Sequence, residues 1–323
     1  MPVPQAPMIP LPEPESKEHF VALHAFETGY MRCHQSVFID GLLGDANVRS
    51  WRFFISHAPS NTKLWFDLGL SNDLTDYPPS LQERHQKFFD AKPAQNTLRD
   101  DLKALNVDGS DIGFVVASHA HWDHMFPVKQ YLPKAKVLCG PGTLSLTQDT
   151  WPSKEDSEYD GRIWNPQTSE LPINELLSPS SAPEQYWCHV GPFDRGHDFF
   201  GDGSFYLIDS PGHMSGNLSA LCRTQTRTGE LRWVLLAGDC IHSPHFVHHP
   251  EAPFGCNLPT PSGCIHSDPA LARDTIRRIS ALKSGDSRVL VWLAHAESLE
   301  GQWDFDLAPG ASASNSVKGW ETV

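Results

Sequence analysis

Short apolar runs, separated by turn-forming residues, recur along the chain and predict a protein rich in strands. The runs at residues 36–39, 51–55 and 64–66 suit three consecutive antiparallel strands. The run at residues 114–117 is apolar throughout, which is typical of a strand buried on both faces in a sheet covered by helices. Later strands are predicted at residues 136–139, 205–208, 218–222, 233–237 and 289–293.

Two helices are predicted from their capping residues and their apolar faces. Thr97 and Asp100 have the spacing of a capping box at the start of a helix, and Gly109 is expected to end that helix. Asp268 followed by Pro269 starts a second helix, because proline is favoured in the first helical turn. The apolar faces are Leu98, Leu102 and Leu105 in the first helix and Ala272, Ile276, Ile279 and Leu282 in the second.

Proline and loop-forming residues predict how the chain is organised. Residues 1–32 begin with a proline at every second or third position, so they are expected to form an extended arm and lead-in that packs on the domain or on the partner subunit of a homodimer. Residues 33–300 are predicted to form a single α/β domain, and residues 301–323 a C-terminal tail. Residues 148–203 have little periodicity and are interpreted as an elaborated loop that acts as a lid or pocket wall, with a solvated insertion as the alternative.

The composition fits a globular protein and excludes some partners. The 323 residues are 39% hydrophobic, which is ample for a buried core. The net charge of -14 argues against nucleic-acid binding, which needs clustered Lys and Arg. The sequence has no apolar stretch that would span a bilayer and no secretory signal, so a cytoplasmic protein without a membrane partner is expected. The seven cysteines form no CxxC pair and are expected to be free thiols.

Candidate metal ligands are concentrated in one segment that directly follows the predicted strand at residues 114–117. Positions 118 to 124 read Ser-His-Ala-His-Trp-Asp-His. Residues two apart in a strand-end loop project the same way, so His119 and His121 can bind one ion, while Asp123 and His124 are placed to bind a second. A site for two ions needs further ligands from elsewhere in the chain.

Further candidates lie at the ends of other predicted strands, which is where α/β folds collect their sites. His213 follows the predicted strand at residues 205–208 through a Pro-Gly turn. Asp239 comes after the strand at residues 233–237 and one glycine, and His295 lies at the end of the strand at residues 289–293. The two carboxylate oxygens of Asp239 can bridge two cations. Asp67, after the run at residues 64–66, is interpreted either as a hydrogen-bond partner of a metal-binding histidine or as an ordinary turn residue.

With these motifs in this order, the sequence resembles the metallo-β-lactamase superfamily. The HxHxDH motif of that family stands at residues 119–124, and its later histidine, bridging aspartate and last histidine match His213, Asp239 and His295. The resemblance covers residues 33–300 and implies an αββα sandwich. It also implies that one ion is bound by His119, His121 and His213 and the other by Asp123, His124 and His295, with Asp239 between them.

Among subfamilies, the pattern is similar to the N-acyl-homoserine lactonases, which carry all seven ligands on one compact domain. Those enzymes place a tyrosine three residues after the bridging aspartate, where this chain has His242. The proline-rich arm and residues 148–203 are also additional to the segments of a minimal lactonase. Fungal γ-lactamases that open benzoxazolinone-type rings are a second model from the same superfamily.

The resemblance implies a dinuclear hydrolase that opens a small cyclic ester or amide, by attack of a metal-bridging hydroxide on the substrate carbonyl. Two zinc ions are expected from the histidine and carboxylate ligands, although manganese, iron or cobalt would also suit them. Asp123 is the candidate to accept the proton of the water, and Asp123 or His242 to protonate the leaving group. The nearby His245, His248, His249 and His266 are interpreted as polar loop residues without a ligand role.

Other activities of the superfamily stay open at this stage. A glyoxalase-type thioesterase normally carries a helical C-terminal domain, whereas few residues follow Glu300. An iron-dependent persulfide dioxygenase uses one iron held by fewer ligands, so metal analysis separates it from a dinuclear hydrolase. A non-catalytic member is expected to have lost ligands, and all seven positions are intact.

Overall fold

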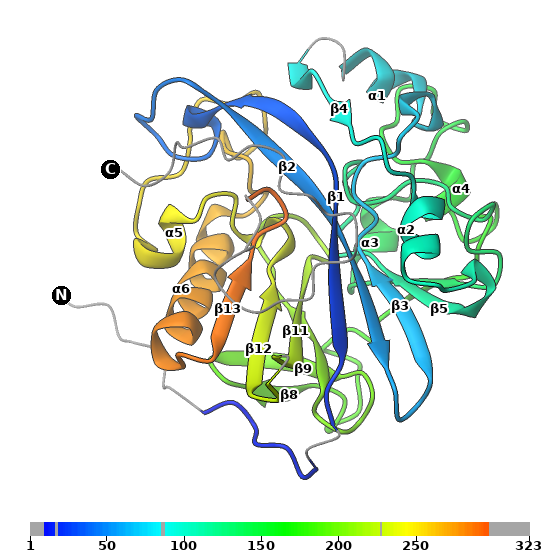
Figure 1. Cartoon of the computed structure of the whole chain (residues 1–323). Helices are drawn as coiled ribbons and strands as arrows, with labels where there is room; N and C mark the ends of the chain where they lie inside the picture. The colour runs from blue at the N-terminus through cyan, green and yellow to red at the C-terminus, as the bar shows by residue number, and fades with distance from the viewer. Residues whose placement is uncertain (1–9, 17–18, 85–87, 227, 297–323) are drawn as a thin grey trace.

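Two β-sheets pack face to face in the computed structural model, which describes residues 10–16, 19–84, 88–226 and 228–296. Helices lie on both outer sides: α6 beside β12 and β13 on one side, and α2 with α4 on the other (Figure 1). This is the αββα arrangement predicted from the sequence. Within the described ranges, helices lack the length and apolar character needed to cross a membrane.

The first sheet has the strand order β4-β1-β2-β3-β5-β6-β7. Its strands are β1 (Ala22–His34), β2 (Asp45–His57), β3 (Thr62–Phe66), β4 (Lys92–Pro93), β5 (Ile112–Val116), β6 (Lys136–Cys139) and β7 (Ile173–Glu175). The strands from β1 to β3 pair antiparallel, whereas β3, β5, β6 and β7 pair in parallel. The helices that follow these strands are α1 (Pro79–Arg84), α2 (Leu98–Ala104), α3 (Thr143–Leu146) and α4 (Gly161–Trp164).

The second sheet has the strand order β13-β12-β11-β10-β9-β8. Its strands are β8 (Cys188–Val190), β9 (Phe193–Asp198), β10 (Phe205–Asp209), β11 (Leu218–Gln225), β12 (Leu231–Leu236) and β13 (Val289–Trp292). The helices of this half are α5 (His245–His248) and α6 (Pro269–Gly285). Short 3-10 helices complete the described chain: η1 (Gln35–Val37), η2 (Leu74–Asp76), η4 (Gly109–Asp111) and η5 (Gly238–Cys240).

One of the buried cores lies between the two sheets. Phe53 and Phe66 of the first sheet belong to the same buried cluster as Leu207 and Val234 of the second. Alternate residues of a strand point to the same face, so each strand contributes every second side chain to this layer. Truncating a buried phenylalanine of this kind to alanine typically costs about 3–5 kcal/mol of folding free energy.

Both predicted helices form with the predicted caps. Thr97 and Asp100 make the reciprocal hydrogen bonds of a capping box at the start of α2. Asp268 accepts hydrogen bonds from the backbone N–H groups of Ala270 and Leu271 at the start of α6, at 3.1 and 3.0 Å. The apolar face of α6 is buried through Ala272, Ile276, Ile279 and Leu282, as predicted.

Two local predictions are wrong. Residues 36–39 do not form a strand, because β1 ends at His34 and the N–H of Phe38 bonds back to the carbonyl of Gln35 in a helical turn. Gly109 does not end α2, which stops at Ala104 and is followed by Asn106 in a left-handed conformation (φ 52°). Asparagine tolerates that conformation, so the chain can turn there before Gly109 begins η4.

The structure also differs from the predicted organisation in the N-terminal part and in residues 148–203. β1 begins at Ala22, so the first sheet incorporates residues that were expected to be lead-in before position 33. Residues 148–203 contain α4, the edge strands β7 and β8, and β9 between β8 and β10. β7 and β8 have three residues each, and β9 is mostly polar, so none gives a clear strand pattern in the sequence. The role of residues 148–203 as a lid stays a prediction. Residues 1–9 of the predicted arm and the predicted tail, 301–323, lie outside the described residues.

Candidate metal centre

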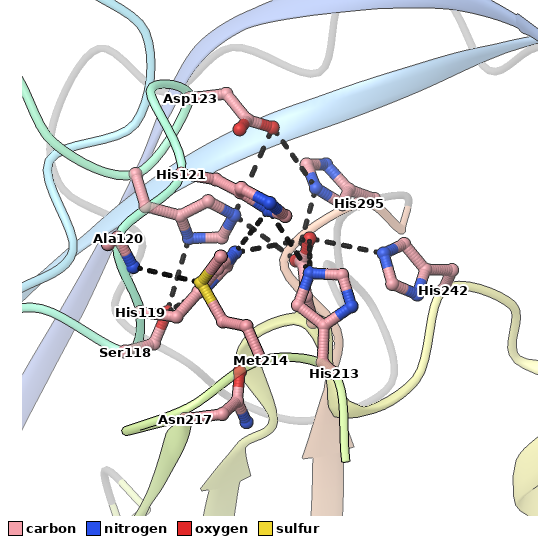
Figure 2. Close-up of polar contacts among 12 residues, drawn as sticks. Ser118, His119, Ala120, His121, Asp123, His213, Met214, Asn217, His242 and His295 are labelled. Atoms are coloured by element: carbon pink, nitrogen blue, oxygen red, sulfur yellow. Dashed lines mark hydrogen bonds and ion pairs between the residues drawn. The ribbon is translucent and has the colours of Figure 1, made fainter. Parts of the chain in front are cut away.

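The predicted metal ligands converge where strands of both sheets end. β10, β12 and β13 run in the same direction, because β11 is antiparallel to both β10 and β12, and β13 is parallel to β12. His213, Asp239 and His295 follow these strands and therefore reach the same edge of the second sheet. The loop after β5 brings His119 and His121 to them. Figure 2 shows the four histidine side chains pointing toward one region: His119, His121, His213 and His295.

One group of ligand atoms has the spacing of a tetrahedral metal site. Nδ1 of His121 lies 2.9 Å from Nε2 of His119 and 3.1 Å from Nε2 of His213. Oδ2 of Asp239 lies 3.6 and 3.5 Å from the same two Nε2 atoms. In a tetrahedral zinc site with bonds of about 2.0–2.1 Å, neighbouring ligand atoms lie about 3.3 Å apart. The four side chains can therefore surround one ion.

A second group lies on the other side of Asp239. Its Oδ1 atom is 3.1 Å from Nε2 of His124 and 3.1 Å from Nε2 of His295. Oδ2 of Asp123 lies 3.3 Å from Nε2 of His295 and 3.9 Å from Nε2 of His124. Each oxygen of Asp239 thus faces a different group of ligands.

Unsatisfied polar atoms in these groups fit bound cations. Nε2 of His124 and Oδ1 of Asp239 are buried and lie 3.1 Å apart, but neither makes a hydrogen bond of good geometry with the other or with another described residue. A buried polar atom without a partner costs about 1–3 kcal/mol, and a divalent cation would accept the lone pairs of both. The residues present therefore fit a metal centre.

Hydrogen bonds orient several of the histidines from behind. The Nδ1 atoms of His119, His124 and His295 lie 2.9, 2.8 and 2.8 Å from Ser118 Oγ, Asp67 Oδ2 and the carbonyl oxygen of Arg49, respectively. Such contacts fix the tautomer and leave Nε2 free to bind a metal. Asp67 is therefore a hydrogen-bond partner of His124, and metal binding by His124 stays a prediction.

Comparisons with known proteins agree with this geometry. No family model matches the chain. The metallo-hydrolase mfmC of Annulohypoxylon moriforme is 28% identical over 342 residues, covering 91% of this chain and 84% of mfmC. The γ-lactamase MBL2 of Gibberella moniliformis is 30% identical over 177 residues, covering 55% of this chain and 70% of MBL2. The chain belongs to the metallo-β-lactamase superfamily.

A solved structure shows the same fold for this superfamily member. An N-acyl homoserine lactone hydrolase, with N-hexanoyl-L-homoserine bound at its catalytic metal centre, matches with a TM-score of 0.59 and 16% identity. The match covers 85% of this chain and 94% of that enzyme. This metallo-β-lactamase superfamily protein is a metal-dependent hydrolase.

In the metallo-β-lactamase centre, burial lowers the pKa values of the histidines, whereas the negative charge of Asp239 raises them. Burial holds the pKa values of His119 and His213 well below the usual range. Burial also acts to lower the pKa of His295, but the Asp239 carboxylate outweighs it and raises that pKa to about 9. The pKa of His124 is likewise raised well above its usual value, because Asp239 and Asp67 outweigh its burial. Positive charge is therefore favoured on the side of Asp239 that faces His124 and His295.

Two more histidines of this superfamily member lie against the ligands. Nε2 of His242 is 3.1 Å from Oδ2 of Asp239, and its ring stacks on Phe38 with the centroids 5.4 Å apart. The ring of His266 lies 5.4 Å from the rings of both His213 and His242, and its side chain is 1% exposed. Burial lowers the pKa of His266 to about 3, so its ring is neutral.

The place of His266 was missed by sequence reasoning. His245 is half-buried and His248 and His249 are exposed, but His245 and His248 lie in the helix α5 and not in a loop as predicted. His266 also differs from the prediction, because it reaches the ligand cluster with His213 and His242. Its spacing from the ligand motifs carries no signal that separates it from the other three.

Proposed function

We propose that this protein opens a small cyclic ester or amide with two divalent metal ions, preferably zinc. The observation that carries the proposal is the position of Asp239, whose two oxygens face two separate groups of ligands. The γ-lactamase and the lactone hydrolase to which the chain is similar support the substrate class. Imidazole ligands with few carboxylates suit zinc, and manganese, iron or cobalt are less well matched to them.

The ligand sets follow the two groups in the structure. His119, His121 and His213 would hold one ion, Asp123, His124 and His295 the other, and Asp239 both. Two bound cations lower the pKa of water and stabilise the negative charge that develops as a carbonyl is attacked.

Asp123 and His242 are the candidates for proton transfer. Asp123 is 7% exposed, and its Oδ2 atom lies 3.3 Å from Nε2 of His295. Besides binding a metal ion, Asp123 would accept the proton that the attacking water loses. A bond then forms between the water oxygen and the carbonyl carbon, and the ring C–O or C–N bond breaks. The leaving oxygen or nitrogen takes a proton from Asp123 or from His242, so the product is a hydroxy acid or an amino acid.

The test combines metal analysis with a substrate panel on the purified full chain. We expect two zinc ions per chain and opening of a lactone or a lactam. A pH indicator detects the acid released from a lactone, and chromatography detects the amino acid formed from a lactam, because the new amine takes up the proton. His121→Ala and Asp239→Ala should lose both metal and turnover, whereas His248→Gln, a change at an exposed position in α5, should retain both.

Other outcomes identify the alternatives. One iron per chain with oxygen consumption would indicate a persulfide dioxygenase, and turnover of thioesters alone would indicate a glyoxalase-type thioesterase. An Asp239→Ala protein that is active without metal would overturn the proposal.

A further inference from the structure

Nδ1 of His213 differs from the Nδ1 atoms of the other candidate ligands whose Nε2 atoms face Asp239. The Nδ1 atoms of His119, His124 and His295 each have a hydrogen-bond partner, whereas Nδ1 of His213 is buried with none among the described residues. Metal-binding histidines almost always donate this second N–H to an acceptor, because the bond fixes the tautomer and the ring orientation. His213 therefore needs an acceptor close by.

His266 is a neighbouring group that can meet that need, with its ring 5.4 Å from the ring of His213. Its Nδ1 atom is also buried without a partner, and so is Nδ1 of His242. One ring nitrogen from each of His213, His242 and His266 lies within 4.8 Å of the others. Two hydrogen bonds of about 2.9 Å to a shared oxygen span about 4.7 Å at a tetrahedral angle, so one water can join these rings.

The surroundings of His266 hold its ring in place. Phe254 packs on it with the centroids 4.7 Å apart, and the Arg273 guanidinium lies 3.8 Å from the centroid of Phe254. Ser262 Oγ donates a hydrogen bond to the carbonyl oxygen of His266 at 2.7 Å. A ring fixed by stacking and by its backbone is suited to orienting a neighbour.

The backbone next to His266 is joined to the backbone of His213. The N–H of Ser267 donates to the carbonyl of His213 at 2.8 Å, and the N–H of Asp268 donates to the carbonyl of Gly212 at 2.9 Å. These bonds keep the two loops in register. Movement of one histidine relative to the other is therefore restricted.

We propose that His266 is a positioning residue for His213, accepting the Nδ1–H of that ring through one water molecule so that Nε2 is directed at the metal. The proposal rests on the proposed function, since it assumes a cation at the His119, His121 and His213 group. It adds a residue that lies outside the seven-ligand pattern.

The experiment measures the stepwise zinc affinities of the full chain by competition with a chromophoric chelator. His266→Phe keeps the aromatic packing on Phe254 but removes both ring nitrogens, and we expect it to weaken one of the two zinc sites about 10- to 100-fold. His266→Gln keeps a polar side chain of similar reach and should recover most of the affinity. His213→Gln should weaken the same binding step, and His248→Gln should leave both steps unchanged.

Separate outcomes bear on the two proposals. If wild-type protein binds two zinc ions and His266→Phe binds them with unchanged affinities, the role of His266 is overturned while the proposed function stands. Loss of a third equivalent of zinc in His266→Phe would also overturn it, because His266 would then be a ligand. Equal weakening of both sites with a lower melting temperature of the zinc-free protein would show a merely structural role. A wild-type protein that binds no metal would overturn the proposed function itself.

Discussion

Asp67 holds His124 by a hydrogen bond of 2.8 Å between Oδ2 and Nδ1, and its other oxygen accepts the backbone N–H of Ser118 at 2.7 Å. Asp67→Asn keeps an oxygen for Ser118 and suits the left-handed backbone at this position (φ 54°), but it removes the negative charge beside His124. We expect zinc affinity of one site to fall about 10- to 100-fold, as measured by chelator competition. Unchanged affinity would show that Asp67 only supports the loop.

His242 is expected to act in turnover and not in metal retention. His242→Phe preserves the stacking on Phe38 but removes the Nε2 atom beside Asp239. Loss of a general acid should lower kcat about 10²- to 10⁴-fold, with two zinc ions still bound. His242→Tyr, which restores the residue type of the lactonases at this position, should recover part of the activity. A loss of zinc in His242→Phe would instead make His242 a ligand.

Zinc binding should release protons near neutral pH. Asp239 raises the pKa of His295 to about 9 and raises that of His124 above its usual value, so both rings carry a proton that a cation must displace. The zinc dissociation constant should therefore fall as pH rises from neutral toward about 9. The released protons are measurable with an indicator in weakly buffered solution. A dissociation constant independent of pH over this range would contradict the expectation.

Gly212 is expected to be intolerant of a side chain. Its backbone has φ +126°, and a Cβ atom there would lie 2.2 Å from the backbone nitrogen of Ala272 in α6. Gly212→Ala must shift the loop that carries His213 away from α6, so we expect weaker zinc binding together with a loss of more than about 2 kcal/mol in urea unfolding.

Gly263→Ala is the matched control for that prediction. Gly263 also has a positive φ, of +71°, but a Cβ there has no atom within 4 Å. It should cost about 1–2 kcal/mol from backbone strain alone and leave zinc affinity unchanged. Equal effects of the two substitutions would show that contact with α6 is unimportant.

The ligand set could be predicted from the sequence because local rules apply to it. His119 and His121 are two residues apart after a buried strand, and His213, Asp239 and His295 each follow an apolar run. Strand ends in such folds share an edge, so the candidates could be gathered without knowing the strand order. Helix caps were equally local, since Asp268 satisfies N–H groups within three residues of itself.

Only the tertiary structure decided how those ligands are supported. The hydrogen-bond partner of His295 Nδ1 is the backbone carbonyl of Arg49 in β2. Every residue type carries a backbone carbonyl, so the sequence does not mark this position. His266 reaches His213 because its loop pairs with the loop of Gly212, a contact between segments far apart in sequence. The strands β7, β8 and β9 were also not predicted. β7 and β8 have only three residues each, and the six residues of β9 are mostly polar, so these strands pair through their backbones with almost no periodic pattern in their side chains. Side-chain patterns report what is local or periodic, whereas backbone pairing between distant segments depends on the folded arrangement.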